Sequence, residues 1–155
     1  MNVMRRQITG TFILLFLSAF CAIGAPQKDT VNAAWLRKGC VAIIAFDARG
    51  KTNMGDDKAI LFQAVMFIRG FIDGFCTAQV AVKEESELFS PPDDWLDVSK
   101  AAASLLNFMK KNEGRIPDNT SARMVMALWY CGNHPKATDA NKASSEKMLN
   151  NLMRN

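Results

Sequence analysis

The 155-residue sequence contains one histidine, His134, and it has no CxxC or HxxxH spacing. Histidine is the commonest general base and the commonest metal ligand, so its scarcity leaves few ways to build a catalytic pair or a zinc centre. His134 follows a helix in a Gly-Asn-His-Pro turn, and we expect it at the surface. No glycine-rich phosphate-binding loop is present. The sequence therefore predicts no enzyme activity, no cofactor and no metal.

Strand patterns and a nucleic-acid footprint are also missing. No segment alternates apolar and polar residues between hairpin turns, which argues against a β-rich fold. The 19 basic and 15 acidic side chains give a net charge of +4. The basic residues occur singly or in pairs and are not interleaved with aromatics, so we expect no nucleic-acid partner.

One long apolar run is present, close to the N-terminus. Arg5 and Arg6 precede the apolar residues 12–20, and small residues follow between 22 and 25. This order predicts a cleavable signal peptide at residues 1–25 and therefore export to the periplasm. Cleavage would remove both arginines and lower the net charge from +4 to +2. No later run reaches membrane-spanning length, so we expect no membrane contact after cleavage.

Apolar residues recur every three or four positions in two segments after the signal. The first predicted helix begins at an Asn32 cap and ends near residues 46–47, before an exposed loop at residues 48–55. Asp56 or Asp57 then caps a second helix. This helix is apolar around most of its circumference, so we expect it to lie centrally with neighbours on more than one side.

Two pairs of residues, one of glycines and one of charged side chains, interrupt the apolar pattern of the second helix. Gly70 and Gly74 lie one turn apart, and each glycine costs about 1 kcal/mol relative to alanine. The pair therefore predicts close packing against another backbone, either within the chain or in a homodimer that uses the Gly70 face. Arg69 and Asp73 lie four positions apart on one helical face and predict an ion pair.

A proline-containing loop separates the second and third helices. Residues 83–92 are polar and then extended, because Pro91-Pro92 restrict the backbone. Asp93 and Asp94 are predicted to cap the third helix, which stops at Gly114. Each of the two Asp pairs of the chain, Asp56-Asp57 and Asp93-Asp94, is explained by capping better than by acid–base catalysis.

The fourth helix is predicted to open at Asp118 or Thr120 and to end with Gly132 as its C-terminal cap. We expect residues 26–136 to form one helical domain and residues 137–155 to form a polar tail or a short fifth helix. Roughly 130 residues remain after the signal, enough for one hydrophobic core. The predicted fold is an all-α, compact bundle of four to five helices with one disulfide.

Cysteines outnumber histidines in this chain. Cys21 leaves with the signal, and Cys40, Cys76 and Cys131 remain. Exported cysteines meet an oxidising compartment, where thiols tend to pair. Three thiols predict one intramolecular disulfide with one free thiol, or a bridge between two chains. The residues alone do not choose the pair.

A series of short motifs runs from Leu36 to Cys131. The motifs are Leu36-x-x-x-Cys40, Phe67-Ile68-Arg69-Gly70-Phe71-Ile72-Asp73-Gly74, Phe89-x-Pro91, Leu105-Leu106 with a later Pro117, and Ala127-Leu128-Trp129-Tyr130-Cys131. This series resembles the Rap/Tai family of type VI secretion immunity proteins. The resemblance implies a small periplasmic helical domain that binds and occludes a peptidoglycan amidase effector, and so protects the cell from a self or sibling toxin.

The resemblance also bears on the disulfide and on the contact surface. Several family members carry cysteines at Ser90 and near Ile68, which this chain lacks, so the usual two bridges cannot form as such. A loop near residues 50–55 between the first two helices would place Cys40 opposite the early half of the second helix, well short of Cys76, so Cys76 with Cys131 is the preferred pair. The family motif contains scaffold positions only, so we expect a separate contact surface on the loop before the third helix. Its candidate effector contacts are Lys83, Glu84, Glu85, Glu87, Phe89 and Asp93.

Two other functions fit parts of the pattern. A small periplasmic helical stress chaperone would hold unfolded clients through exposed apolar surface, and it would suppress the aggregation of unrelated proteins. A secreted enzyme would lose its activity when His134 or an aspartate pair is replaced. We favour the immunity protein over the chaperone, and either over the enzyme.

Overall fold

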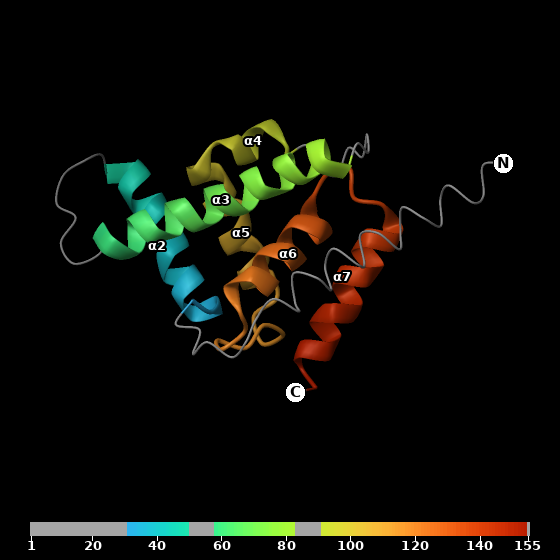
Figure 1. Cartoon of the computed structure of the whole chain (residues 1–155). Helices are drawn as coiled ribbons and strands as arrows, with labels where there is room; N and C mark the ends of the chain where they lie inside the picture. Colours follow the sequence, from blue (N-terminus) through green and yellow to red (C-terminus); the bar gives the residue numbers. More distant parts are fainter. Residues whose placement is uncertain (1–30, 50–57, 83–90, 155) are drawn as a thin grey trace. The chain divides into compact units, whose positions relative to one another are not determined.

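The structure is a computed structural model, and it describes residues 31–49, 58–82 and 91–154. These ranges contain six helices and no strand, which confirms the all-α prediction (Figure 1). The helices are α2 (Ala33–Arg49), α3 (Lys58–Val82), α4 (Asp93–Leu96), α5 (Val98–Lys111), α6 (Ala122–Asn133) and α7 (Asp139–Leu152). The predicted signal peptide, and Asp56 and Asp57, lie outside the described residues.

Helix α2 begins as predicted and ends later. The Asn32 side chain accepts a hydrogen bond from the Trp35 backbone N–H at 3.0 Å, so Asn32 caps the helix. The helix continues to Arg49, so Ala48 and Arg49 are helical and not part of the predicted loop. The rest of that loop lies outside the described residues.

The sequence predicts one helix after Pro92, but the structure has two. The backbone of Asp97 is extended, with φ −84° and ψ 113°, which separates α4 from α5. The Asp97 side chain accepts hydrogen bonds from the Ser99 and Lys100 backbone N–H groups, so Asp97 caps α5. Asp93 and Asp94 are therefore not caps but occupy the first turn of α4, where their charges favour the helix dipole.

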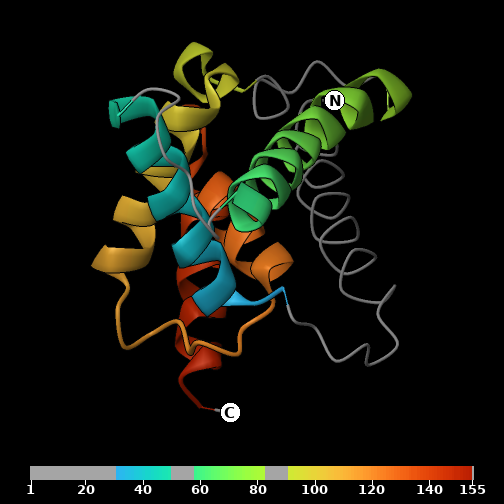
Figure 2. The same ribbon diagram turned by 90° about the vertical axis from the view of Figure 1, so that its left-hand side faces the viewer.

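The segment between α5 and α6 pairs with the beginning of α2 (Figure 2). The Ala33 N–H donates to the Thr120 carbonyl at 2.8 Å, and the Ala122 N–H donates to the Val31 carbonyl at 3.2 Å. Because this pairing extends to Ser121, α6 begins one residue later, and the predicted openings at Asp118 and Thr120 are wrong. First-turn donors of α2 thereby find acceptors far away in the sequence.

The C-terminal part is more helical than the composition indicates. Gly132 lies inside α6, and His134 is the C-cap, so the predicted glycine cap is wrong. Thr138 and Asn141 then form a capping box that opens α7. The alternative of a fifth helix in the tail is thus confirmed, and α7 packs against α6.

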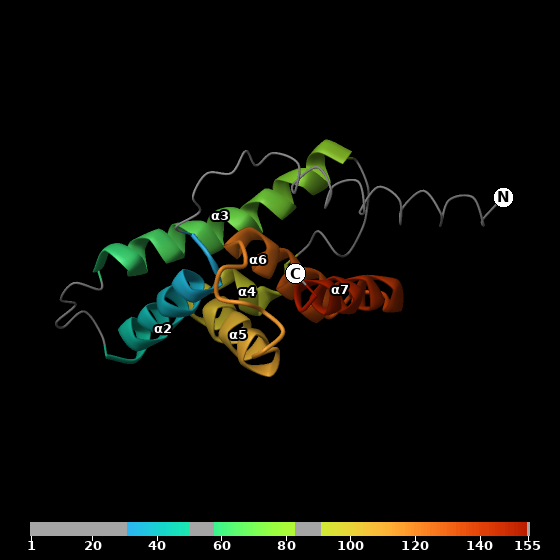
Figure 3. The same cartoon turned by 90° about the horizontal axis from the view of Figure 1, so that it is seen from below.

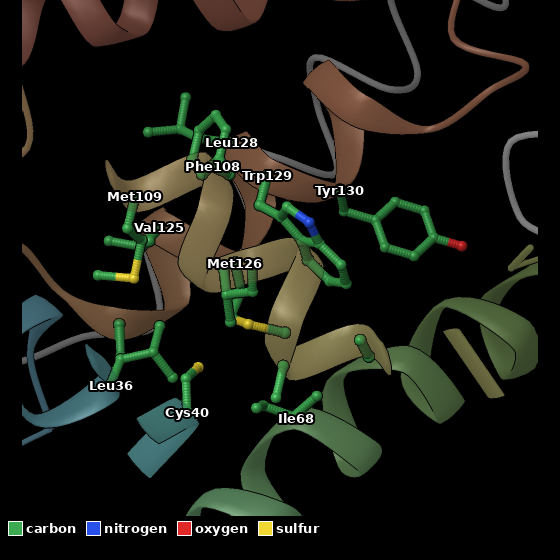
Figure 4. Close-up of a cluster of buried hydrophobic side chains, with 14 of the residues drawn as sticks. Leu36, Cys40, Ile68, Phe108, Met109, Val125, Met126, Leu128, Trp129 and Tyr130 are labelled. Atoms are coloured by element: carbon green, nitrogen blue, oxygen red, sulfur yellow. The ribbon is translucent and has the colours of Figure 1, made fainter. Parts of the chain in front are cut away.

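The core lies where α2, α3, α5 and α6 meet (Figure 4). Helix α2 packs against both α3 and α5, and Trp129 of α6 is fully buried. Fully buried core side chains from the four helices include Leu36, Cys40, Ile68, Ile72, Leu105, Met109, Met126 and Trp129. Burying a large apolar side chain stabilises a fold by about 1.5–3 kcal/mol, so these residues dominate the stability.

Helix α3 is not surrounded by neighbours as its composition predicts. It buries Ala64, Ile68 and Ile72 along one face. In Figure 3 the helices α2, α4, α5 and α6 all lie on one side of α3. The opposite face therefore exposes apolar side chains, and the central placement predicted from the apolar circumference is wrong.

The close helix contact occurs at a different glycine from the predicted pair. A Cβ atom on Gly39 of α2 would stand 2.5 Å from the Ala64 Cβ of α3, too close for any side chain. Gly70 and Gly74 have no such neighbour within 4 Å. The intrachain form of the close-packing prediction is therefore wrong, and contact with a second copy stays a prediction.

Candidate interaction surface

One predicted contact residue, Asp93, falls in the described part of the chain. It lies exposed in the first turn of α4. The other candidates, which belong to the preceding loop, lie outside the described residues: Lys83, Glu84, Glu85, Glu87 and Phe89. The part of the predicted contact surface that the structure describes is therefore the part on helix α4.

Trp95 fixes helix α4 on the core. Its side chain is buried, and its ring centroid lies 4.2 Å from that of Trp129 and 5.2 Å from that of Tyr130. A helix of four residues has little stability of its own, so this aromatic packing holds it in place. The sequence interpretation missed Trp95. Its signal is a lone aromatic directly after Pro-Pro-Asp-Asp.

The exposed side of α4 adjoins the middle of α3. Arg69 pairs with Asp73, with Nε 3.0 Å from Oδ2, which confirms the predicted ion pair. The Arg69 Nη1 also donates to the Leu96 carbonyl at 3.1 Å and so links the two helices. We call Asp93, Leu96, Arg69 and Asp73, together with Asp94, the α4 surface.

Charge on the α4 surface is partly neutralised within the chain. The Lys100 ammonium donates to Asp94 at 2.9 Å, and this hydrogen bond, together with the Asp94 charge, raises the pKa of Lys100. Asp93 has an exposed carboxylate, and Leu96 has an exposed apolar side chain on the same short helix. An acidic group beside an exposed leucine can contact a partner that offers a basic group and an apolar side chain.

The three thiols are free in the structure, so the predicted disulfide is not confirmed. Burial raises the pKa of Cys40 to about 12 and that of Cys131 to about 11. Cys76 is half-buried, and its pKa is raised first by burial and then by the Asp73 charge. Thiols with raised pKa values stay protonated near neutral pH and react slowly as nucleophiles.

His134 is buried and not at the surface as the turn composition predicts. Its side chain is 2% exposed and packs against the rings of Trp95 and Tyr130, with centroids 5.7 and 5.4 Å away. Its Nδ1 accepts a hydrogen bond from the Lys136 backbone N–H at 3.1 Å. The turn folds back over the aromatic cluster, which local sequence cannot reveal.

The described helices and turns offer neither a metal site nor a membrane-spanning helix. Among these residues no group of three or more His, Cys, Asp or Glu side chains could hold a metal ion. Of the helices that the structure describes, none combines the length and apolar character needed to cross a membrane.

Comparison with known proteins adds no assignment. No family model matches the sequence, no curated protein matches it, and no solved structure matches the fold.

Proposed function

We propose that this protein is a periplasmic immunity protein that binds and occludes a type VI secretion peptidoglycan amidase effector. It would act as a binding protein and not as an enzyme, and it would reach the periplasm through the predicted signal peptide. The proposal is carried by one observation, which is where the fold places the residues of the motif series.

The motif residues form the shared core. Nine of them are buried, and they come from α2, α3, α5 and α6: Leu36, Cys40, Ile68, Ile72, Leu105, Leu128, Trp129, Tyr130 and Cys131. Residues that jointly fill one core specify a fold, as expected if the motif series describes a scaffold. A family with a common scaffold and different targets would then carry recognition on its surface.

The α4 surface and the loop that precedes it are the proposed effector contacts. Trp95 holds α4 rigidly, and the hydrogen bond from Arg69 to Leu96 links it to α3. A preformed surface loses little conformational entropy on binding, which favours tight inhibition. Asp93 would meet a basic group near the effector's active site, and Leu96 would supply apolar contact.

A disulfide between Cys76 and Cys131 forms part of the proposal. Burial raises the pKa of Tyr130 most, and negative charge on Cys76 or Cys131 would raise it further. Both cysteines therefore lie near this one side chain. Cys40 is fully buried in α2 and is the proposed free thiol. Peptide mapping of the exported protein should find Cys76 linked to Cys131 and one alkylated cysteine. Any other pairing contradicts this part.

Co-expression in the periplasm tests the function. Candidate amidase toxins are exported with and without this protein, and cell lysis is measured. We expect rescue from one toxin and none from unrelated toxins. Failure to rescue any amidase, with the protein present and folded in the periplasm, contradicts the proposal.

Two matched variants test the contact surface. Asp93→Lys with Leu96→Lys should weaken toxin binding at least tenfold, about 1.4 kcal/mol or more. Asp139→Lys is the control, because Asp139 is an exposed acid in the first turn of α7. Equal binding by both variants would remove the α4 surface from the proposal but leave the function to the rescue experiment.

A periplasmic stress chaperone is the second candidate function, because two large apolar side chains on α3, Phe62 and Met66, are exposed. It predicts that the purified protein suppresses the aggregation of several unrelated denatured proteins. An immunity protein should leave their aggregation unchanged.

A further inference from the structure

Positive charge gathers at the end of the helical bundle where α5 and α7 end and α6 begins. Exposed basic side chains come from all three of these helix ends. They are Lys110, Lys111, Arg123, Lys147 and Arg154, and we call them the basic end. In the sequence these residues are dispersed as one pair and three single residues. The fold therefore builds a charged surface that the sequence pattern does not show.

Contacts between distant segments hold the basic end together. In the turn after α5, the Arg115 Nη2 lies 2.6 Å from the Glu146 Oε2 and 3.0 Å from the Asn150 Oδ1, both on α7. The Ser145 hydroxyl donates to the Leu128 carbonyl, so α7 packs antiparallel on α6 and its last turn lies beside the first turn of α6. Figure 2 shows the connection from α5 to α6 and the end of α7 together at the bottom of the view.

Neighbouring carboxylates neutralise little of this charge. Glu146 pairs with Arg115, and Asp118 pairs with Arg37, so both carboxylates are already used. Glu113 is the one other acidic residue in the ranges 110–123 and 145–154. Within the described part of the chain, the side-chain nitrogens of the basic end make no ion pair. Their charge therefore faces solvent.

Helix stability does not account for the whole basic end. Lys110 and Lys111 lie in the last turn of α5, where positive charge favours the helix dipole. Arg123 lies in the first turn of α6, where positive charge opposes the dipole, and no acidic residue accompanies it there. An exposed cation at an unfavourable helical position indicates that its counter-charge is supplied from outside the chain.

An exposed apolar side chain lies among these charges. Met153 follows α7 directly, precedes Arg154 and is 52% exposed. Cations bind the phosphate groups of an anionic bilayer, and an adjacent apolar side chain can enter the boundary between head groups and acyl chains. Nucleic acids and acidic polysaccharides offer no apolar layer for Met153, so the combination favours a lipid surface.

We propose that the basic end docks on the surface of a membrane that contains anionic phospholipids. This contact replaces the sequence-based expectation of no membrane contact, which rests on the dispersed basic residues and on the lack of a further membrane-spanning run. It is a surface contact and needs no spanning helix.

Docking through the basic end would also orient the protein. Asp97 begins α5 and Asp93 lies on the adjoining α4, whereas the basic end includes the other terminus of α5. A helix of 14 residues is about 21 Å long, so the acidic and basic groups are well separated. Anionic lipid would repel the acidic terminus, and the α4 surface would face away from the membrane.

Co-sedimentation with lipid vesicles tests the proposal. The exported protein is mixed with vesicles of equal parts phosphatidylcholine and phosphatidylglycerol, or of phosphatidylcholine alone. We expect it to pellet with the mixed vesicles at about 0.1 M salt and to be released at about 1 M salt, because the Debye length falls from about 10 Å to about 3 Å. Equal pelleting with both kinds of vesicle, or none with the mixed vesicles, would overturn the proposal.

Arg123→Glu with Lys147→Glu is the decisive variant. Both residues are exposed, and glutamate suits the first turn of α6, so the fold should be retained. Each cation near an anionic membrane strengthens binding roughly fivefold, so the loss of two should weaken vesicle binding at least about 20-fold. Lys58→Glu with Lys100→Glu is the matched control, because both lysines are exposed in the first turns of α3 and α5 and the net charge changes equally. Equal weakening by the two variants would overturn the proposal.

Heparin, a soluble acidic polymer, separates lipid from other anions. Strong retention on heparin without any binding to the mixed vesicles would overturn the membrane as partner and indicate an acidic polymer instead. The docking does not rest on the proposed function, because its evidence lies in residues 110–154. The Arg123→Glu, Lys147→Glu variant should still bind a cognate effector, so failure of either proposal leaves the other intact.

Discussion

Two helix junctions in this protein each place a glycine beside a cysteine, but different contacts limit how closely the helices approach. Gly39 lets α2 approach α3, and Gly132 lets α6 approach α7. Each glycine is next to a buried cysteine, Cys40 in the first junction and Cys131 in the second. The junctions differ in what faces the glycine.

At the first junction the facing group is a methyl that cannot move. A Cβ on Gly39 would lie 2.5 Å from the Ala64 Cβ. At the second junction it is a hydroxyl, since a Cβ on Gly132 would lie 3.0 Å from the Ser145 Oγ. That Oγ donates to the Leu128 carbonyl at 3.0 Å. The first junction is therefore fixed by backbone distance, and the second depends on one hydrogen bond.

The largest effect should come from filling the first junction. Gly39→Leu forces α2 away from α3, and we expect a loss of about 3 kcal/mol of unfolding free energy or more, because core overpacking costs about 1–3 kcal/mol and here the backbones must separate. Urea unfolding measures it.

Gly70→Ala is the matched control for this change. Gly70 is also a helical glycine but faces open space, so alanine there should add up to about 1 kcal/mol. A Gly39→Leu variant as stable as the wild type would contradict the close approach of α2 and α3.

At the second junction, the sign of the stability change caused by Gly132→Ala should depend on the Ser145 hydroxyl. Gly132→Ala alone should cost about 1 kcal/mol, because the clash with Ser145 exceeds the gain in helix propensity. In a Ser145→Ala background the same change should gain about 1 kcal/mol. A double-mutant cycle measures a coupling of about 2 kcal/mol. A coupling near zero would show that the hydroxyl does not limit this junction.

Raising the pH above 9 should lower the stability of the reduced protein through its two buried thiols, Cys40 and Cys131. The pKa of Cys40 rises from 9.0 to about 12 on folding, so its contribution is complete below pH 9 and is lost as the pH rises toward 12. For Cys131 the loss ends near pH 11. We expect each thiol to lower stability by about 1 kcal/mol between pH 8 and pH 10.

Cys40→Ala and Cys131→Ala test these contributions. Each variant should reduce the pH dependence of the urea midpoint, whatever its effect at pH 8. An unchanged slope in the Cys40→Ala variant would contradict the buried position of that thiol.

The smallest effects should come from the ion pairs that attach residues 112–121 to each junction. Arg37 of α2 pairs with Asp118, and Arg115 pairs with Glu146 of α7 at 2.6 Å. Both pairs are partly exposed, so Asp118→Asn and Glu146→Gln should each cost under about 1 kcal/mol. Salt should reduce both effects. A loss above about 2 kcal/mol would show that a pair is more than a surface contact.

Features that depend on neighbours in sequence could be predicted. The Asn32 cap and the ion pair of Arg69 with Asp73 are local, and both are confirmed. Gly39 could not be identified, because its role depends on Ala64 in another helix. Gly70 and Gly74 have the same unfavourable helix propensity as Gly39, but they face away from the neighbouring helices.

The candidate surface could be predicted only in part. Asp93 is exposed as expected, whereas the break at Asp97 and the packing of Trp95 were missed. The sequence pattern predicts one continuous helix through Asp97, although an aspartate followed by Val-Ser-Lys suits a cap. Turn composition predicts His134 at the surface, but it carries no information on what the turn covers, and the residue is buried.

The backbone pairing between residues 31–34 and 118–122 has a kinetic consequence. The first turn of α2 needs carbonyls that lie about 90 residues further along, and closing so long a loop is slow compared with forming a helix. Among the described segments, the first turn of α2 is therefore one of the last to reach its native state.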